Sequence, residues 1–124
     1  MKAVVNALIV EKDCILLVKR SWESDEPNMW SLPGGTVEGD ESLIEALKRE
    51  LNEELGISSY GIIEFFKQVD FSPEVRAYYF LLHLKKRPDI TLEPDELSEH
   101  KFVKIGTNLD KMAFWQERIL SAAN

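Results

Sequence analysis

The sequence of 124 residues contains one cysteine, Cys14, so a disulfide within the chain is excluded. Because disulfides are typical of oxidising compartments, this favours a cytoplasmic protein. The sequence also lacks a run of about 18 apolar residues, which a membrane-spanning helix requires. The short apolar stretch near its start is not followed by a small-residue cleavage site, so we interpret it as a strand and not as a signal peptide.

Basic residues are scarce: 15 Lys and Arg stand against 22 Asp and Glu, and the formal net charge is −7. A nucleic-acid-binding protein usually shows a basic face, so this balance argues against a nucleic-acid polymer as partner. The same negative charge would repel an anionic small molecule, unless a metal cation or local arginines intervene.

No repeat, low-complexity segment or linker interrupts the sequence, so we expect residues 1–124 to form one domain. A helix is predicted between Asp40 as N-cap and Gly56 as C-terminal stop, and an amphipathic helix is predicted at 109–123. Extended segments are predicted at 3–10, 14–20, 30–35, 62–71, 75–86 and 101–105. This order predicts an α/β (α+β) fold with a mixed β-sheet between helices.

The stretch RELNEEL, residues 49–55, lies on the first predicted helix. Glu50, Glu53 and Glu54 are separated by three and four positions, which places their carboxylates on one helical face. That face borders the predicted apolar stripe, so we expect these glutamates at the edge of the core. The stripe consists of Ile44, Leu47, Leu51 and Leu55.

Spacing alone leaves two interpretations of this glutamate cluster open. In the first, it is an exposed face with ion pairs, because Glu45–Arg49 and Arg49–Glu53 have the i, i+4 spacing. That interpretation leaves Glu50 and Glu54 without a cation three or four residues further along. In the second, the clustered carboxylate oxygens bind a hard divalent cation, Mg²⁺ or Mn²⁺. Such a cation would also bridge an acidic protein to an anionic phosphate.

The wider frame resembles the Nudix box, G-x5-E-x7-R-E-U-x-E-E-x-G-U, where U is a bulky aliphatic residue. Residues Gly35 to Ile57 match it at every fixed position, and WSLPGG, residues 30–35, is similar to the family's usual lead into the box. The resemblance implies a Nudix-like α/β/α sandwich. It also implies a hydrolase that cleaves the pyrophosphate linkage of a nucleoside diphosphate derivative, by water attack on phosphorus with help from a divalent metal.

The resemblance further implies roles for individual residues. Glu50 and Glu54 would be metal ligands, and Glu53 would be a further ligand or the carboxylate that orients the attacking water. The carbonyl of Gly34 would be another ligand.

Other roles concern residues around these ligands. Glu41 and Arg49 would hold the ligating carboxylates in place, as outer residues of metal sites do. The general base of the family is a box glutamate or a glutamate late in the chain. Glu96 and Glu99, in DELSEH, are candidates for the second possibility, and their alternative role is that of solvated loop charges.

Substrate contacts are less specified by the sequence. Arg20 ends the second predicted strand, where similar sequences place a basic residue on substrate phosphate; otherwise it is a surface arginine. Trp30 and Phe66 are candidates for stacking on a base, although each is more often core. The substrate classes that remain are the ADP-ribose or nucleotide-sugar type and a non-standard nucleoside triphosphate. Pro73, 16 residues after Ile57, resembles the ADP-ribose subgroup but also suits a turn.

A function of another class is a non-catalytic domain that binds nucleotides or regulates a partner. Nudix domains of that kind usually lose box glutamates, and this chain keeps them all. We therefore expect an enzyme with a small-molecule nucleotide substrate and no membrane association. Because family members often pair, a homodimer is a further expectation.

Overall fold

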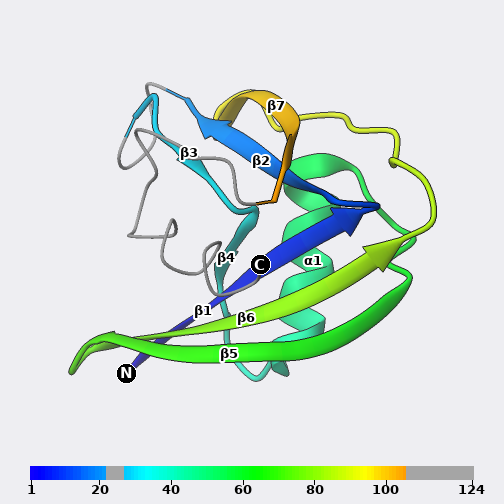
Figure 1. Ribbon diagram of the computed structural model, residues 1–124. Coiled ribbons are helices and arrows are strands. Elements are labelled where there is room, and N and C mark those ends of the chain that lie inside the picture. Colours follow the sequence, from blue (N-terminus) through cyan, green and yellow to red (C-terminus); the bar gives the residue numbers. More distant parts are fainter. Residues whose placement is uncertain (22–26, 106–124) are drawn as a thin grey trace.

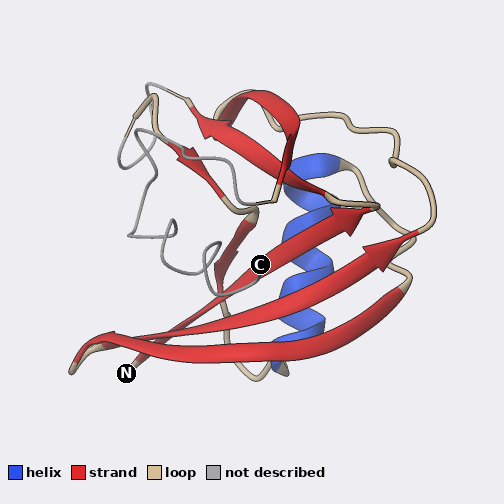
Figure 2. Ribbon diagram, in the orientation of Figure 1, coloured by secondary structure: helices blue, strands red, loops and turns tan. Residues whose placement is uncertain are grey.

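A mixed β-sheet of seven strands forms the centre of the computed structural model, which describes residues 1–21 and 27–105 (Figure 1). The strands are β1 (Lys2–Glu11), β2 (Cys14–Arg20), β3 (Trp30–Ser31), β4 (Gly34–Thr36), β5 (Ile62–Ser72), β6 (Val75–Leu84) and β7 (Leu97–Lys104). In this part of the chain one helix, α1 (Leu43–Leu55), crosses one face of the sheet (Figure 2).

The sheet has the order β3-β2-β1-β6-β5, with β4 paired to β1 and β7 paired to β2. β1 and β6 run parallel from Lys2↔Val75 to Glu11↔Leu84. The other described strand pairs are antiparallel. The mixed sheet predicted from the sequence is therefore confirmed.

Helix α1 begins at a capping box. The Ser42 hydroxyl accepts from the Glu45 N–H at 3.1 Å, and the Glu45 carboxylate accepts from the Ser42 N–H at 2.8 Å. The predicted N-cap, Asp40, is wrong, because the Ser-x-x-Glu pattern satisfies two helix-start N–H groups reciprocally two residues later. Gly56 ends the helix as predicted, with a left-handed φ of 68° that glycine adopts without strain.

The apolar stripe of α1 packs onto the sheet. Ala46, Leu47, Leu51 and Leu55 are fully buried, whereas Ile44 is partly buried at the margin. They contact a cluster from the sheet that includes Val5, Ile9, Leu16, Val18, Phe80 and Leu82. A second buried cluster, with Leu8, Leu17 and Tyr79, belongs to the opposite face of the sheet, because these residues alternate with the first set along their strands.

Several predicted elements differ from the structure or lie outside the described residues; the segment predicted at 30–35, for example, is divided between β3 and β4. The strand predicted at 101–105 is longer, because β7 begins at Leu97 and pairs with β2 from Arg20↔Leu97 to Cys14↔Lys104. The strand predicted at 75–86 ends at Leu84. The helix predicted at 109–123 lies outside the described residues. Within the described ranges, no helix is long and apolar enough to cross a membrane.

Candidate active site

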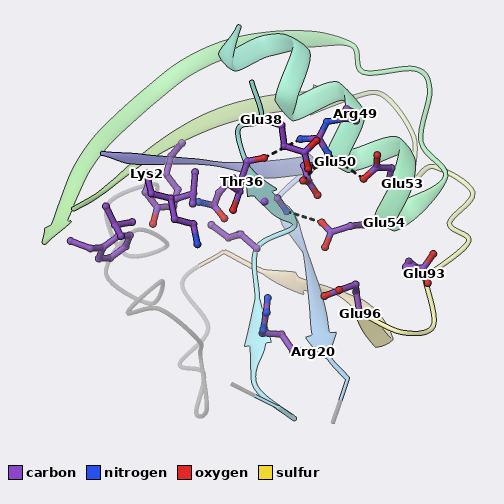
Figure 3. Close-up of a pocket in the computed structure, with 18 of the residues that line it drawn as sticks. Lys2, Arg20, Thr36, Glu38, Arg49, Glu50, Glu53, Glu54, Glu93 and Glu96 are labelled. Atoms are coloured by element: carbon purple, nitrogen blue, oxygen red, sulfur yellow. Dashed lines mark hydrogen bonds and ion pairs between the residues drawn. The ribbon is translucent and has the colours of Figure 1, made fainter. Parts of the chain in front are cut away.

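A cleft of about 930 Å³ lies where α1, β1, β4 and the segment before β7 meet (Figure 3). Its acidic lining residues are Glu38, Glu50, Glu53, Glu54, Glu93, Asp95 and Glu96, and its basic ones are Lys2, Arg20 and Arg49. The cleft thus gathers much more negative than positive charge around the box residues of α1.

Arg49 holds several of these groups in place. Its guanidinium donates to both carboxylate oxygens of Glu41, at 2.6 Å from Nε and 3.0 Å from Nη2. Nη2 also donates to the Thr36 carbonyl at 2.9 Å, and Nη1 donates to Glu50 at 3.0 Å and Glu53 at 3.2 Å. One planar side chain therefore links α1 to β4 and to the turn before the helix.

The pKa values around Arg49 follow from these contacts. The hydrogen bonds from Arg49 lower the pKa of Glu41, and the N–H of Glu38 lowers it further, with a donor–acceptor distance of 2.9 Å. The bond to Glu41 in turn raises the already high pKa of Arg49. Arg49 and Glu41 are therefore a charged pair over the whole physiological pH range.

The pKa values of Glu50 and Glu54 are raised, whereas that of Glu41 is lowered. Burial raises the pKa of Glu50, although the hydrogen bond from Arg49 opposes this shift. Burial and the charge of Glu50 raise the pKa of Glu54 to about 8, against the lowering effects of the Gly34 N–H at 3.1 Å and the charge of Arg20. Two carboxylates are thus held close together and partly out of water, which disfavours charge on both.

The ion pairs of α1 differ in part from those expected if the glutamate cluster were an exposed face with Glu45–Arg49 and Arg49–Glu53 pairs. Glu45 belongs to the capping box, and Arg49 pairs instead with Glu41, Glu50 and Glu53. Glu50 has no cation three or four residues further along, but Arg49 at the preceding position turns its Nη1 onto the Glu50 carboxylate. The i, i+4 pair between Arg49 and Glu53 is confirmed.

The donor set suits a hard divalent cation, because the oxygens of Glu50, Glu53 and Glu54 are ligands that Mg²⁺ and Mn²⁺ prefer. Glycine at position 35 allows the Glu50 carboxylate to approach the backbone, since a Cβ there would collide with that carboxylate. Across residues 1–21 and 27–105, however, no three Asp, Glu, His or Cys side chains are arranged to hold a metal ion. Glu50 and Glu53 contact Arg49 instead, and Glu54 contacts the N–H of Gly34.

The loop before β7 brings one of the two late glutamates into the cleft. The Glu93 N–H donates to the Glu54 carbonyl at 2.9 Å, which fixes this loop against the end of α1. Glu96 lines the cleft, and its negative charge contributes to the raised pKa of Glu54. Glu99 lies on β7, where its carboxylate contacts the Lys19 ammonium at 3.3 Å, and it is not among the lining residues.

Of the three residues predicted to contact substrate, Arg20 lines the cleft, whereas Trp30 and Phe66 do not. Arg20 lines the cleft close enough for its charge to lower the pKa of Glu54 (Figure 3). Trp30 and Phe66 pack against the second buried cluster, and neither is among the lining residues. The ring of Trp30 contacts the Lys101 ammonium, 3.9 Å from its centroid.

Several cleft residues were not singled out from the sequence, among them Glu38, Glu93, Asn6 and Tyr79. Glu93 belongs to a loop that is recognisably acidic, but its contact with α1 depends on how that loop packs. Asn6 and Tyr79 lie within apolar strands, where the sequence pattern predicts core.

The family model of the NUDIX domain matches residues 1–123. Together with the complete box on α1 and its loops, this shows that the chain belongs to the Nudix hydrolase family.

Two curated relatives carry names with different substrates. The CTP pyrophosphohydrolase of Escherichia coli (strain K12) is 52% identical over 56 residues, 44% of this chain and 42% of that protein. The ADP-ribose pyrophosphatase of Methanocaldococcus jannaschii is 31% identical over 115 residues, 90% of this chain and 67% of that protein. The match spans only 42% to 61% of the length of the first four curated relatives.

Solved structures share the fold. A MutT NUDIX hydrolase from Burkholderia pseudomallei has a TM-score of 0.87 at 26% identity, with 99% of this chain and 98% of that chain covered. A bifunctional NMN adenylyltransferase/ADP ribose pyrophosphatase from Francisella tularensis, in complex with AMP and a manganese ion, has a TM-score of 0.76 at 26% identity. The match covers 98% of this chain and 40% of that chain.

Proposed function

We propose that the protein is a metal-dependent hydrolase that cleaves the pyrophosphate linkage of a nucleoside diphosphate derivative, by water attack on phosphorus. The observation that carries the proposal is the pair Glu50 and Glu54, two partly buried carboxylates in one cleft: burial disfavours the charged form of both, and the charge of Glu50 disfavours it further in Glu54. Such an arrangement is unfavourable for a scaffold and is suited to binding a cation.

In this proposal Glu50, Glu53, Glu54 and the carbonyl of Gly34 would hold Mg²⁺ or Mn²⁺, exchanging some of their present contacts for it. The related Francisella tularensis structure is a complex with a manganese ion, which supports a divalent cation as the cofactor. When bound, a divalent cation neutralises pyrophosphate oxygens and lowers the pKa of water. Arg49, fixed by Glu41 and the Thr36 carbonyl, keeps the carboxylates of α1 oriented.

Glu96 is our candidate for the general base, because it lines the same cleft as the box glutamates. Glu53 is the alternative base within the box. Glu99 is the weaker candidate, because its carboxylate contacts the Lys19 ammonium. Arg20 would contact a substrate phosphate, since it is one of the basic residues of the cleft. Trp30 as a base-stacking residue has less support, because its ring contacts Lys101.

The substrate would be a small nucleotide of the nucleoside triphosphate or the ADP-ribose class, which are the classes named for the two relatives. A non-catalytic nucleotide-binding role is the alternative, and the complete set of box glutamates argues against it. A cytoplasmic location and a homodimer stay predictions.

The test is an assay of CTP and ADP-ribose hydrolysis with Mg²⁺, with Mn²⁺ and with EDTA, in which the released nucleoside monophosphate is measured. We expect turnover of at least one substrate, loss of that turnover in EDTA, and its return with added cation. Undiminished turnover in EDTA would exclude the metal mechanism. Nucleotide binding without turnover under every metal condition would favour the non-catalytic alternative.

A further inference from the structure

The cleft has a second region beyond the carboxylates. Its floor there is one face of the β1–β6 pair, made by Lys2, Val4 and Asn6 of β1 and by Val75 and Tyr79 of β6. Residues at alternate positions of a strand share a face, and in-register neighbours on adjacent strands project to the same side. The pairs Lys2↔Val75 and Asn6↔Tyr79 therefore place this whole set on one surface.

Tyr79 is the unusual member of this floor. Its side chain is 0% exposed, and its hydroxyl has no hydrogen-bond partner. The other buried hydroxyl without a partner in the described part of the chain, that of Ser31, is not among the residues lining the cleft. Most buried polar groups are hydrogen-bonded, and Tyr79 is one of the residues that line the cleft, so its unpaired hydroxyl points to a partner that a bound ligand supplies.

The chemistry of this hydroxyl suits a polar ligand atom. Burial raises the pKa of Tyr79 to about 12, so the phenol stays protonated at physiological pH. A protonated phenol can donate one hydrogen bond and accept another. The surrounding floor offers apolar side chains from Val4 and Val75, on which a flat ring can lie.

The position of Tyr79 relative to the carboxylates follows from strand register. Asn6 is the register partner of Gly34 on one side and of Tyr79 on the other. Adjacent strands are about 4.8 Å apart, so the backbones of Gly34 and Tyr79 are separated by about 10 Å. The N–H of Gly34 donates to Glu54. A nucleotide with its phosphates at Glu54 therefore has its base within reach of the β1–β6 floor.

We propose that the Tyr79 hydroxyl hydrogen-bonds the polar edge of the substrate's nucleobase and so determines which nucleotide the enzyme prefers. The inference rests on the proposed function and deepens it by assigning the base to the β1–β6 floor. The strand neighbour Tyr78 provides a matched control, because it packs against the cluster on the α1 face of the sheet.

The experiment compares wild type with Tyr79→Phe and Tyr78→Phe, measuring kcat/KM for CTP, UTP, ATP and GTP, together with the melting temperature. We expect Tyr79→Phe to lower kcat/KM for the preferred nucleotide by about 3- to 30-fold, mainly through KM, and to reduce its advantage over the others. The melting temperature should stay equal or rise, since the substitution removes an unpaired polar group. Tyr78→Phe should keep the wild-type preference.

Three results would overturn the inference: no base preference in wild type, an equal change for all four nucleotides in Tyr79→Phe, or a clear fall of its melting temperature. If wild type hydrolyses none of the four, equilibrium binding of CMP, UMP, AMP and GMP replaces the kinetics. Loss of base preference in Tyr79→Phe alone then supports the inference even though the proposed hydrolysis has failed. Unchanged binding of all four monophosphates would refute it.

Discussion

The guanidinium of Arg49 donates two hydrogen bonds to the carboxylate of Glu41, with Nε–Oε2 and Nη2–Oε1 distances of 2.6 and 3.0 Å. This pairing fixes the third nitrogen, Nη1, which reaches Glu50 and Glu53. The orientation of two box carboxylates therefore depends on a residue that precedes the helix, eight positions earlier in the chain.

Replacing Arg49 tests whether this orientation matters for metal binding. Arg49→Lys keeps the positive charge but loses the fork that contacts Glu41 and Glu50 together. We expect activity at limiting Mg²⁺ to fall by about 10- to 100-fold, as is usual when residues that orient metal ligands are lost. The activity of Arg49→Ala at limiting Mg²⁺ should fall by at least as much. The measurement is initial rate against Mg²⁺ concentration.

Arg76→Lys is the matched control for Arg49, because Arg76 forms an exposed pair with Asp70 at 2.7 Å and does not line the cleft. It should have wild-type rates. If Arg49→Lys also has wild-type rates at every Mg²⁺ concentration, Arg49 is only a charge at the surface.

Glu96 and Glu99 are the two late glutamates predicted as general base, and their glutamine variants can be compared directly. Glu96→Gln should lower kcat by about 10²- to 10⁴-fold with little change in KM, because the carboxylate lost from the cleft would be the proton acceptor. Glu99→Gln should change kcat very little, since it removes a charge that contacts Lys19 outside the cleft. Steady-state kinetics of both variants decide the assignment. A reversed pattern would move the base to β7, and two active variants would place it within the box.

The sequence predicted the helix, its stripe and the box because all three depend on local spacing. Residues three and four apart share a face on any helix, so Glu50 and Glu54 at the edge of the core followed from their separation from Leu47 and Leu51. The N-cap was misplaced because Asp40 and Ser42 are both good caps, and only the reciprocal contact with Glu45 distinguishes them. Glu41 consequently lies outside the helix.

What the sequence could not supply is the pairing between distant segments. Glu96 and Glu99 look alike in DELSEH, and only the pairing of β7 with β2, with its irregularity between Lys19 and Arg20, separates one from the other. Tyr79 lies in an apolar strand, so the sequence pattern alone predicts that it is a core residue. Its unpaired hydroxyl becomes apparent only when β1 and β6 are placed side by side.

The raised pKa of Glu54 predicts a pH dependence of folding stability without metal. This carboxyl ionises at about pH 8 in the folded protein and near pH 4.5 in the unfolded chain, so the unfolded chain loses the proton first as the pH rises. The stabilisation due to this group is complete below about pH 4.5 and is lost progressively up to about pH 8. In Glu54→Gln that decrease should be absent. Melting temperatures measured in EDTA from pH 5 to pH 8.5 test this, and equal slopes for the two proteins would contradict it.

Binding of a divalent cation by the carboxylates of α1 can be measured directly as the rise in melting temperature that Mg²⁺ or Mn²⁺ produces. A cation that binds the folded state alone raises its stability by mass action. We predict a clear rise for wild type and for Glu99→Gln, and loss of most of that rise in Glu54→Gln, whose side chain has nearly the same shape without the charge. No rise in wild type, or an equal rise in Glu54→Gln, would show that these carboxylates do not bind the cation.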